Sequence, residues 1–290
     1  MSILSINPIY QTESLKAIWS NGLKTNGYNN ESVILNNPYQ CCALSNFIHA
    51  THNPSALGTE AENTDQFLAT VRTELNSLSF SKKNNDLYQF KLSKDLKNLQ
   101  RDAKTKNKTS HLSQLRDFFY GPLREWMSEV SGINLRADYV PLTASSYSYT
   151  DHLLCHDDEL EDRRIAFVLY LTSGWTEKDG GQLELFESTK NGDPGEVVQR
   201  ITPQANMLSF FHVSAQSYHQ VAEVINPAAV RLSINGWYHG EPLPRPPPYV
   251  EPPEALYSPG SISSDKYDLV FDEIEQKKFF AQRRFVPNKR

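Results

Sequence analysis

The stretch Arg164–Thr172, RIAFVLYLT, predicts a buried β-strand because Val, Ile, Leu, Phe and Tyr dominate it. Further short runs of similar composition follow, separated by clusters of Gly, Pro and Asn: Gln182–Glu187, Glu196–Ile201, Met207–Val213, Gln220–Ile225 and Arg231–Tyr238. Short strands at this spacing, without long helices between them, are typical of an antiparallel barrel or a two-sheet jelly roll. We therefore predict a mainly β fold with supporting helices, in which strands distant in the chain lie side by side.

A possible metal site spans these strands. His156 and Asp158 precede the first strand, and His219 comes some sixty residues later. Two imidazoles and one carboxylate can occupy one face of an iron(II) octahedron, which leaves positions for an organic co-substrate and dioxygen. A His-x-Asp/Glu pair alone is a weak signal, and His239/Glu241 is a second one. That pair follows the last strand and has no downstream partner, so we predict His156, Asp158 and His219 as the ligands.

Arg231 and Ser233 follow the second histidine in the chain. A dicarboxylic keto acid bound to iron through its keto oxygen and one carboxylate needs a cation deeper in the pocket for its other carboxylate. Arginine offers a planar fork suited to this. Ser233 lies two residues further along the predicted strand, so it should face the same way and add a hydrogen bond.

The composition is ordinary for a soluble globular protein: 290 residues, 22% charged and 39% hydrophobic. A net charge of -5 gives no general attraction to nucleic acid, so we do not expect direct nucleic-acid binding. No apolar run approaches the roughly 20 residues that span a membrane, and the start lacks the features of a secretory signal. Three cysteines, two of them adjacent, make a poor disulfide framework. We expect a reducing setting, in the nucleus or the cytoplasm.

The residues before the predicted barrel contain other recognisable segments. Residues up to about Asn37 are polar and Asn-rich, which predicts partial disorder or a peripheral arm. Tyr39–His49 predicts a buried strand leading into a turn. Helical spacing of apolar residues predicts a helix over Asp65–Leu78, capped by Thr64. A second helical pattern follows Ser110 as its cap and should kink or split at Gly121-Pro122.

Two segments are charged or rich in proline. Lys82–Lys108 is polar and basic; it can be a nucleic-acid or localisation patch, although we favour a solvated loop. Glu241–Gly260 is rich in proline and predicts a stiff linker or packing arm. We therefore expect a catalytic domain over 1–240, with its core at about 134–240, and a proline-rich segment and tail over 241–290.

Four motifs carry a family resemblance: LLCHDDELEDRRIAFVLYL, GGQLELF, FFHVSAQSYHQVAEV and RLSINGWYHG. With these, the chain from about Phe67 to Pro253 resembles the iron(II)- and 2-oxoglutarate-dependent oxygenases, and among them the eukaryotic ribosomal prolyl 3-hydroxylases. The resemblance implies a double-stranded β-helix, or jelly roll. Members generally continue into a second barrel domain, which we expect to be absent from this chain.

The resemblance also implies roles for individual residues. His156, Asp158 and His219 would hold iron(II), Arg231 would bind the distal carboxylate of 2-oxoglutarate, and Tyr147 and Tyr170 would contact that co-substrate. Either tyrosine can equally be a half-buried core residue with its hydroxyl at the rim. No catalytic side chain beyond the metal ligands is expected, because the chemistry needs no general base. L-ascorbate would support the iron, and dioxygen would be consumed.

The implied substrate is a proline in a basic small-subunit ribosomal protein, with an effect on translation. The acidic run beside His156 can line the entrance and attract a basic polypeptide: Asp157, Glu159, Glu161 and Asp162. A solvated loop partly neutralised by Arg163 and Arg164 explains the run equally well. Alternatives are oxidation of a nucleic-acid base, another protein or a small molecule, a non-catalytic metal-binding barrel that acts as an interaction module, and a hydrolytic zinc site. The last leaves Arg231 without a task.

Overall fold

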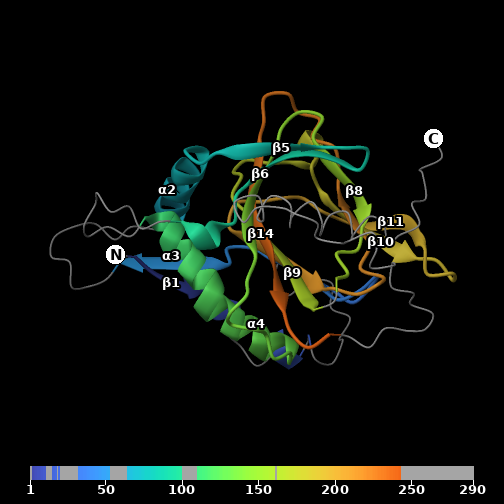
Figure 1. Cartoon of the computed structure of the whole chain (residues 1–290), viewed down its shortest axis with the longest axis horizontal. Coiled ribbons are helices and arrows are strands. Elements are labelled where there is room, and N and C mark those ends of the chain that lie inside the picture. The colour runs from blue at the N-terminus through green and yellow to red at the C-terminus, as the bar shows by residue number, and fades with distance from the viewer. Residues whose placement is uncertain are drawn as a thin grey trace, which may run out of the picture.

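A curled antiparallel β-sheet dominates the computed structural model of the chain, and the helices gather on one side of it (Figure 1). The structure describes residues 2–10, 15–17, 19, 32–52, 64–99, 110–160 and 162–242. The predicted mainly β, jelly-roll type of fold with supporting helices is confirmed.

The large sheet has twelve strands in the order β11-β10-β13-β8-β6-β7-β14-β9-β12-β3-β2, with β5 added at the edge of β6. Strands β1 and β4 form a separate pair. The strands are β1 (Ser2–Ile6), β2 (Val33–Leu35), β3 (Cys41–Leu44), β4 (Ile48–His52), β5 (Phe80–Asn84), β6 (Tyr88–Ser93), β7 (Leu142–Tyr147), β8 (His152–His156), β9 (Arg163–Tyr170), β10 (Leu183–Ser188), β11 (Pro194–Ile201), β12 (Met207–His212), β13 (His219–Val221) and β14 (Arg231–His239).

Strand β9 lies in the interior of the sheet, between β14 and β12. Its alternate residues Ile165, Phe167 and Leu169 belong to the core under the helices, whereas Ala166 and Tyr170 belong to a second cluster inside the curl. Successive side chains of a strand point to opposite faces. Both faces of β9 are therefore buried, which explains its continuous run of apolar residues.

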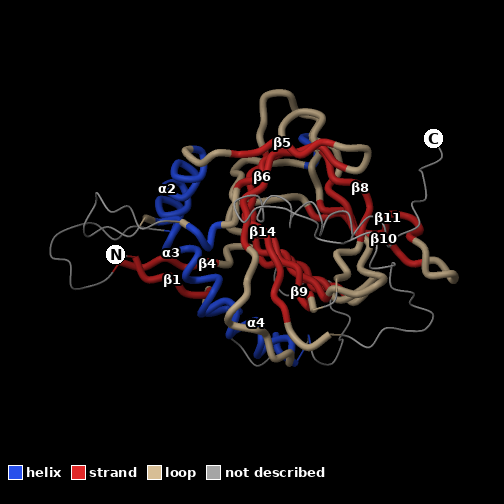
Figure 2. The backbone as a smooth tube through the Cα atoms, viewed as in Figure 1, coloured by secondary structure: helices blue, strands red, loops and turns tan. Residues whose placement is uncertain are grey.

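The helices cover the outer face of this sheet (Figure 2). They are α2 (Thr64–Asn76), α3 (His111–Phe118), a π-helical segment η3 (Phe119–Leu123) and α4 (Arg124–Ser131). The hydroxyl oxygen of Ser110 accepts a hydrogen bond from the backbone amide of Ser113, as expected of the predicted cap. Pro122 lies inside η3, so the predicted interruption takes the form of a π-helical turn.

Four short helical turns complete the elements: η1 (Pro8–Tyr10), η2 (Leu96–Asn98), η3 already described, and η4 (Glu177–Asp179). Thr64 was expected to cap the helix after it, but α2 begins at Thr64 itself. Its hydroxyl oxygen accepts a hydrogen bond from the backbone amide of Ala50 and so joins the helix to β4.

No helix among the described residues has the length and apolarity needed to cross a bilayer.

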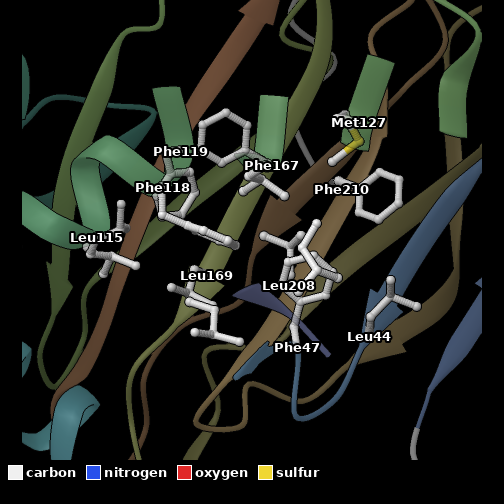
Figure 3. Close-up of a cluster of buried hydrophobic side chains, with 14 of the residues drawn as sticks. Leu44, Phe47, Leu115, Phe118, Phe119, Met127, Phe167, Leu169, Leu208 and Phe210 are labelled. Atoms are coloured by element: carbon white, nitrogen blue, oxygen red, sulfur yellow. The ribbon is translucent and has the colours of Figure 1, made fainter. Parts of the chain in front are cut away.

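The main core fills the space between the helices and the sheet (Figure 3). Its centre is made of side chains from α3, η3 and α4 packed on those of β9, β12 and the β3–β4 turn; labelled in the figure are Leu44, Phe47, Leu115, Phe118, Phe119, Met127, Phe167, Leu169, Leu208 and Phe210. This packing fixes β9, β12 and β14 as a rigid wall, whose other face lines the interior of the curl.

Two predictions for the N-terminal half need correction in part. Ser2–Ile6 is ordered: it forms β1 and pairs with β4, and Tyr10, Leu15 and Trp19 are buried in the main core. These few apolar side chains provide the anchoring that the polar composition concealed. Lys82–Lys108 is likewise not a loop throughout, because its first part forms the β5–β6 hairpin.

The strands from β9 to β14 match their predicted bounds closely, except that β13 ends at Val221, earlier than the predicted Ile225. Tyr39–His49 gives β3, a turn and the start of β4. The basic residues Lys104–Lys108 lie outside the described residues. So do the proline-rich segment and tail beyond residue 242, and the division at residue 240 stays a prediction.

Candidate functional site

Three side chains predicted as metal ligands converge inside the curl. His219 on β13 lies directly opposite His156 on β8 in the antiparallel register, and their ring centroids are 4.1 Å apart. The carboxylate of Asp158 approaches both imidazoles: Oδ2 is 3.5 Å from Nε2 of His219, and Oδ1 is 3.8 Å from Nε2 of His156. The potential ligand atoms all lie within 4.8 Å of one another, and all three residues are buried.

Backbone carbonyls orient both imidazoles. Nδ1 of His156 is 2.8 Å from the carbonyl oxygen of Leu154, and Nδ1 of His219 is 2.8 Å from that of Ser217. A carbonyl only accepts hydrogen bonds, so each Nδ1 carries the proton. Each Nε2 then keeps its lone pair directed toward Asp158, which is the tautomer required of a metal-binding histidine.

Asp158 has a left-handed backbone conformation, with φ at +63°. Aspartate adopts this region more readily than most residues. The buried hydroxyl of Ser217 lies 2.7 Å from the carbonyl oxygen of neighbouring Asp157 and ties the β8 end to the His219 segment. Burial raises the pKa of Asp158, but contacts with His219, His156 and Arg163 outweigh it and hold that pKa well below its usual range.

An ionised carboxylate beside two imidazoles is a donor set that fits iron(II) with open coordination positions. The three donors come from two strand ends joined by a paired register, so their mutual positions are fixed by the sheet. This arrangement can hold a divalent metal ion.

Arg231 supplies a second polar centre in the same interior. It is 2% exposed, and its guanidinium carbon lies 5.0 Å from the ring centroids of both Tyr147 and Tyr170. Among the described residues no carboxylate pairs with it, and its Nε has no hydrogen-bond partner. A buried cation without a counter-charge is costly, so this position is suited to binding an anion.

The register of β14 explains this grouping. Arg231 lies opposite Tyr147 on β7, and Ser233 lies opposite Tyr170 on β9. Ser233 is buried and lines the same cavity as Arg231, as its spacing predicted. Burial raises the pKa of both tyrosines, which keeps their hydroxyls neutral and able to donate hydrogen bonds.

Comparison with known proteins now identifies the segment. Residues 142–239 match the model of the 2OG-Fe(II) oxygenase superfamily. This segment is a 2OG-Fe(II) oxygenase domain. The superfamily uses iron(II) and 2-oxoglutarate, and the triad and Arg231 offer a fitting site for each.

Two relatives are much longer than this chain. The chain is 40% identical over 234 residues to "Prolyl 3-hydroxylase OGFOD1" of Xenopus laevis, which covers 76% of this chain and 44% of that protein. It is 37% identical over 274 residues to the protein of the same name from Mus musculus, covering 89% and 46%. The chain thus spans less than half the length of these relatives.

Among solved structures, the fold is similar to that of a prolyl hydroxylase from Trichoplax adhaerens in complex with a hypoxia-inducible-factor peptide. The TM-score is 0.52 at 19% identity, covering 78% of this chain and 90% of that one. At this identity the likeness concerns the fold.

A cavity of about 640 Å³ connects the two centres of the oxygenase domain. His156, Asp158, His219 and Arg231 all line it, and so does Trp237. Further lining residues come from the hairpin β5–β6 and the segment after it: Lys83, Tyr88, Phe90, Leu92, Lys94 and Lys97. The cavity is large enough for a dicarboxylate and a further group beside the metal site.

Several residues of the site were missed by sequence reasoning. Arg163 packs on Trp237, its guanidinium carbon 3.7 Å from a ring centroid, and both residues line the cavity. Phe90 stacks on Tyr147, with centroids 4.9 Å apart. Trp237 could have been found from the alternation of side chains along β14, because positions 231, 233, 235 and 237 share one face of that strand. Phe90 ends NDLYQF (Asn85–Phe90), which lies within the family resemblance, but its segment was interpreted as a loop and no role followed for it.

The predicted acidic entrance does not form as expected. Asp157 is fully buried, and its side chain accepts the backbone amide of Glu159. Asp162 pairs with Arg136 at 3.0 Å, away from the cavity lining. Asp157 thus caps a local turn and Asp162 forms an ion pair, and Glu161 lies outside the described residues. Among the described lining residues, the acidic ones are Asp95 and Asp158.

Proposed function

We propose that the oxygenase domain catalyses 2-oxoglutarate-dependent hydroxylation of a prolyl residue, at its 3-position, in a small-subunit ribosomal protein. The observation that carries the activity is the unpaired, buried Arg231 lining the same cavity as the His156, Asp158 and His219 triad. The names of the relatives from Xenopus laevis and Mus musculus support the prolyl 3-hydroxylase assignment.

Iron(II) and 2-oxoglutarate supply the oxidising chemistry: dioxygen gives one oxygen atom to the substrate C–H bond and one to 2-oxoglutarate, which becomes succinate and carbon dioxide. The chain holds and orients these groups. His156, Asp158 and His219 would hold the metal, and Arg231 would bind the distal carboxylate through charge-assisted hydrogen bonds. Tyr170, whose ring centroid lies 5.0 Å from the guanidinium carbon of Arg231, can donate a hydrogen bond to the same carboxylate.

Apolar side chains complete the reaction chamber. Ala166, Val168 and Leu183 line the cavity beside the polar groups. They exclude water from the space around the metal, which strengthens the electrostatic contacts made there. None of the three proposed ligands needs to transfer a proton, so no general base is assigned.

The finer parts of the proposal concern the setting. The family resemblance supports a ribosomal protein as the substrate, an effect on translation, action in the nucleus and cytoplasm, and L-ascorbate as the reductant that maintains iron(II). A non-catalytic metal-binding barrel is the main competing function. It would have no use for an arginine buried without a counter-charge beside the triad.

Mass spectrometry of a proline-containing ribosomal-protein peptide, after incubation with the chain, iron(II), 2-oxoglutarate and ascorbate, tests the proposal. We expect a gain of one oxygen on proline, with equal succinate. His156→Ala and Arg231→Ala should abolish the gain, whereas Arg200→Ala, which removes an exposed arginine of edge strand β11, should retain it. Succinate without peptide oxidation would reject this substrate. No succinate at all would favour the non-catalytic barrel.

A further inference from the structure

Positive charge is concentrated in one segment beside the active-site cavity, although the chain as a whole is acidic. Residues 82–108 contain eight lysines and one arginine against three aspartates, whereas the whole chain has a net charge of -5. The described part of this segment forms the β5–β6 hairpin and the turn η2. We call Lys82, Lys83, Lys91, Lys94 and Lys97 the lysine rim. Four of them are exposed, and Lys83 is half-buried.

The lysine rim surrounds both faces of the hairpin. Lys83, Lys94 and Lys97 line the active-site cavity. Lys82 and Lys91 are paired directly opposite each other in the antiparallel register. Successive strand residues point to opposite faces, so Lys82 and Lys91 lie on the face away from the cavity. The hairpin is therefore basic on the side of the cavity and on its outer side.

No described residue forms an ion pair with any lysine of the rim. Lys82 and Lys91 are like charges directly opposite each other, an arrangement that destabilises a sheet. Asp95, the carboxylate nearest in sequence to Lys94, accepts the backbone amide of Lys97 as a helix cap. The local structure gains nothing evident from this charge, which points to an anionic partner outside the chain.

We propose that the lysine rim docks on the phosphate backbone of folded RNA, so that the domain acts on a polypeptide held in a ribonucleoprotein. A peptide in the cavity reaches only Lys83, Lys94 and Lys97. A partner that also engages Lys82 and Lys91 must extend around the hairpin, as a polyanion does. The choice of RNA rests on the proposed ribosomal substrate, because a basic protein alone would be repelled by the rim.

The chemistry of the hairpin indicates contacts to phosphates and not to bases. Lysine is a point charge suited to phosphate. Binding of unpaired bases usually requires exposed aromatic rings for stacking, but Tyr88 and Phe90 of β6 are each 8% exposed. Binding should thus be independent of sequence and strongly dependent on salt. This inference rests on local charge, whereas the expectation of no direct nucleic-acid binding rested on the net charge of the whole chain.

Fluorescence anisotropy of a labelled RNA hairpin titrated with the full chain, at several salt concentrations, tests this inference. The test variant is Lys82→Glu/Lys91→Glu, since neither residue lines the cavity. The matched control is Lys178→Glu/Lys190→Glu, which makes the same charge change at exposed lysines elsewhere. A third variant, Lys82→Arg/Lys91→Arg, keeps the charge. Hydroxylation of a free peptide is measured separately in each protein.

We expect the test variant to bind RNA about tenfold or more weakly, with a log–log salt slope smaller by about 2. The control and the arginine variant should bind like the parent chain. Equal RNA binding by test and control would overturn the proposal. So would a polyglutamate peptide that binds the same lysines as tightly as RNA, since it would assign the rim to an acidic polypeptide. Absence of hydroxylation with RNA binding intact would count against the proposed function alone.

Discussion

The backbone of Gly181 passes against the side chain of Arg231: a Cβ atom at position 181 would lie 3.1 Å from Cδ of that arginine. The same atom would lie 3.2 Å from Trp175 and from Val224. Gly181 also has a φ of +65°, in the region that glycine adopts at least cost. The glycine thus leaves room for the arginine that we assign to 2-oxoglutarate.

Gly181→Ala should weaken 2-oxoglutarate binding by displacing Arg231. Gly192→Ala is the matched control, because Gly192 also has a positive φ, +82°, but nothing lies within 4 Å of its Cβ position. Both variants should lose about 1 kcal/mol of folding free energy from the backbone conformation. Only Gly181→Ala should raise the dissociation constant of 2-oxoglutarate, as measured by calorimetric titration. An equal dissociation constant of 2-oxoglutarate in both variants would show that the close approach of Gly181 to Arg231 does not affect binding.

Replacing Arg231 should have opposite effects on binding and on stability. Arg231→Met removes a buried charge that has no counter-charge among the described residues, so the free protein should unfold at equal or higher denaturant concentration. Affinity for 2-oxoglutarate should fall about 100-fold, as expected for loss of a charge-assisted bidentate contact worth roughly 3 kcal/mol. Arg231→Lys should recover part of the affinity. Chemical denaturation measures the stability of each variant, and calorimetric titration measures its affinity for 2-oxoglutarate. Strong destabilisation by Arg231→Met would indicate that the arginine stabilises the fold.

Ser217→Ala should lower iron(II) affinity without touching a ligand. Its hydroxyl lies 2.7 Å from the carbonyl oxygen of Asp157 and joins the two segments that carry Asp158 and His219. Loss of such a supporting contact typically costs about tenfold or more in metal affinity. Ser113→Ala is the control, because Ser113 is also buried but its hydroxyl donates to the carbonyl oxygen of Ser110, the cap of α3. Competition with a metal-binding dye measures the iron(II) affinity of both variants. Identical iron(II) affinities would contradict a role of Ser217 in supporting the metal ligands.

His212 should make the fold less stable in mild acid. Burial lowers the pKa of His212 to about 4, from an ordinary value near 6.5. The unfolded chain therefore binds more protons between these two values, and stability present above about pH 6.5 is lost as the pH falls toward 4. We expect a loss of about 1–2 kcal/mol by pH 5, after allowing for partial exposure.

His212→Phe should remove this part of the pH dependence. The phenyl ring can keep the edge-on contact with Trp19, whose ring centroid is 4.9 Å away, and the variant loses a buried Nε2 that has no partner. Urea denaturation of both proteins at pH 7 and pH 5 gives the comparison. The difference in unfolding free energy between the two pH values should be smaller in the variant. An equal loss of unfolding free energy in both proteins would mean that groups other than His212 cause the pH dependence.

Much of the fold was predictable because its strands are buried on both faces. Arg164–Thr172 and its successors carry continuous apolar runs between Gly, Pro and Asn turns, and the observed strands follow them. The grouping of His156, Asp158 and His219 was predictable from their order along the chain. Arg231 and Ser233 followed from strand period. The family resemblance was needed to single out Tyr147 and Tyr170.

Other parts could not be predicted because tertiary contacts override local composition. Strand β1, in a stretch that is polar overall, exists through its pairing with β4, and the lysine-rich β5 through its pairing with β6. Nothing local in the sequence distinguishes the buried Asp157 from a solvated acidic residue. The role of Gly181 depends on the approach of Arg231, a residue fifty positions away in the chain.

Anaerobic absorption spectroscopy of the iron(II)-loaded chain, titrated with 2-oxoglutarate, tests most directly the claim that the triad and Arg231 form one site. We predict a visible charge-transfer band that saturates in the parent chain, is absent in His219→Ala, and needs far more 2-oxoglutarate in Arg231→Met. No band in the parent chain, or the same titration in Arg231→Met, would contradict the account.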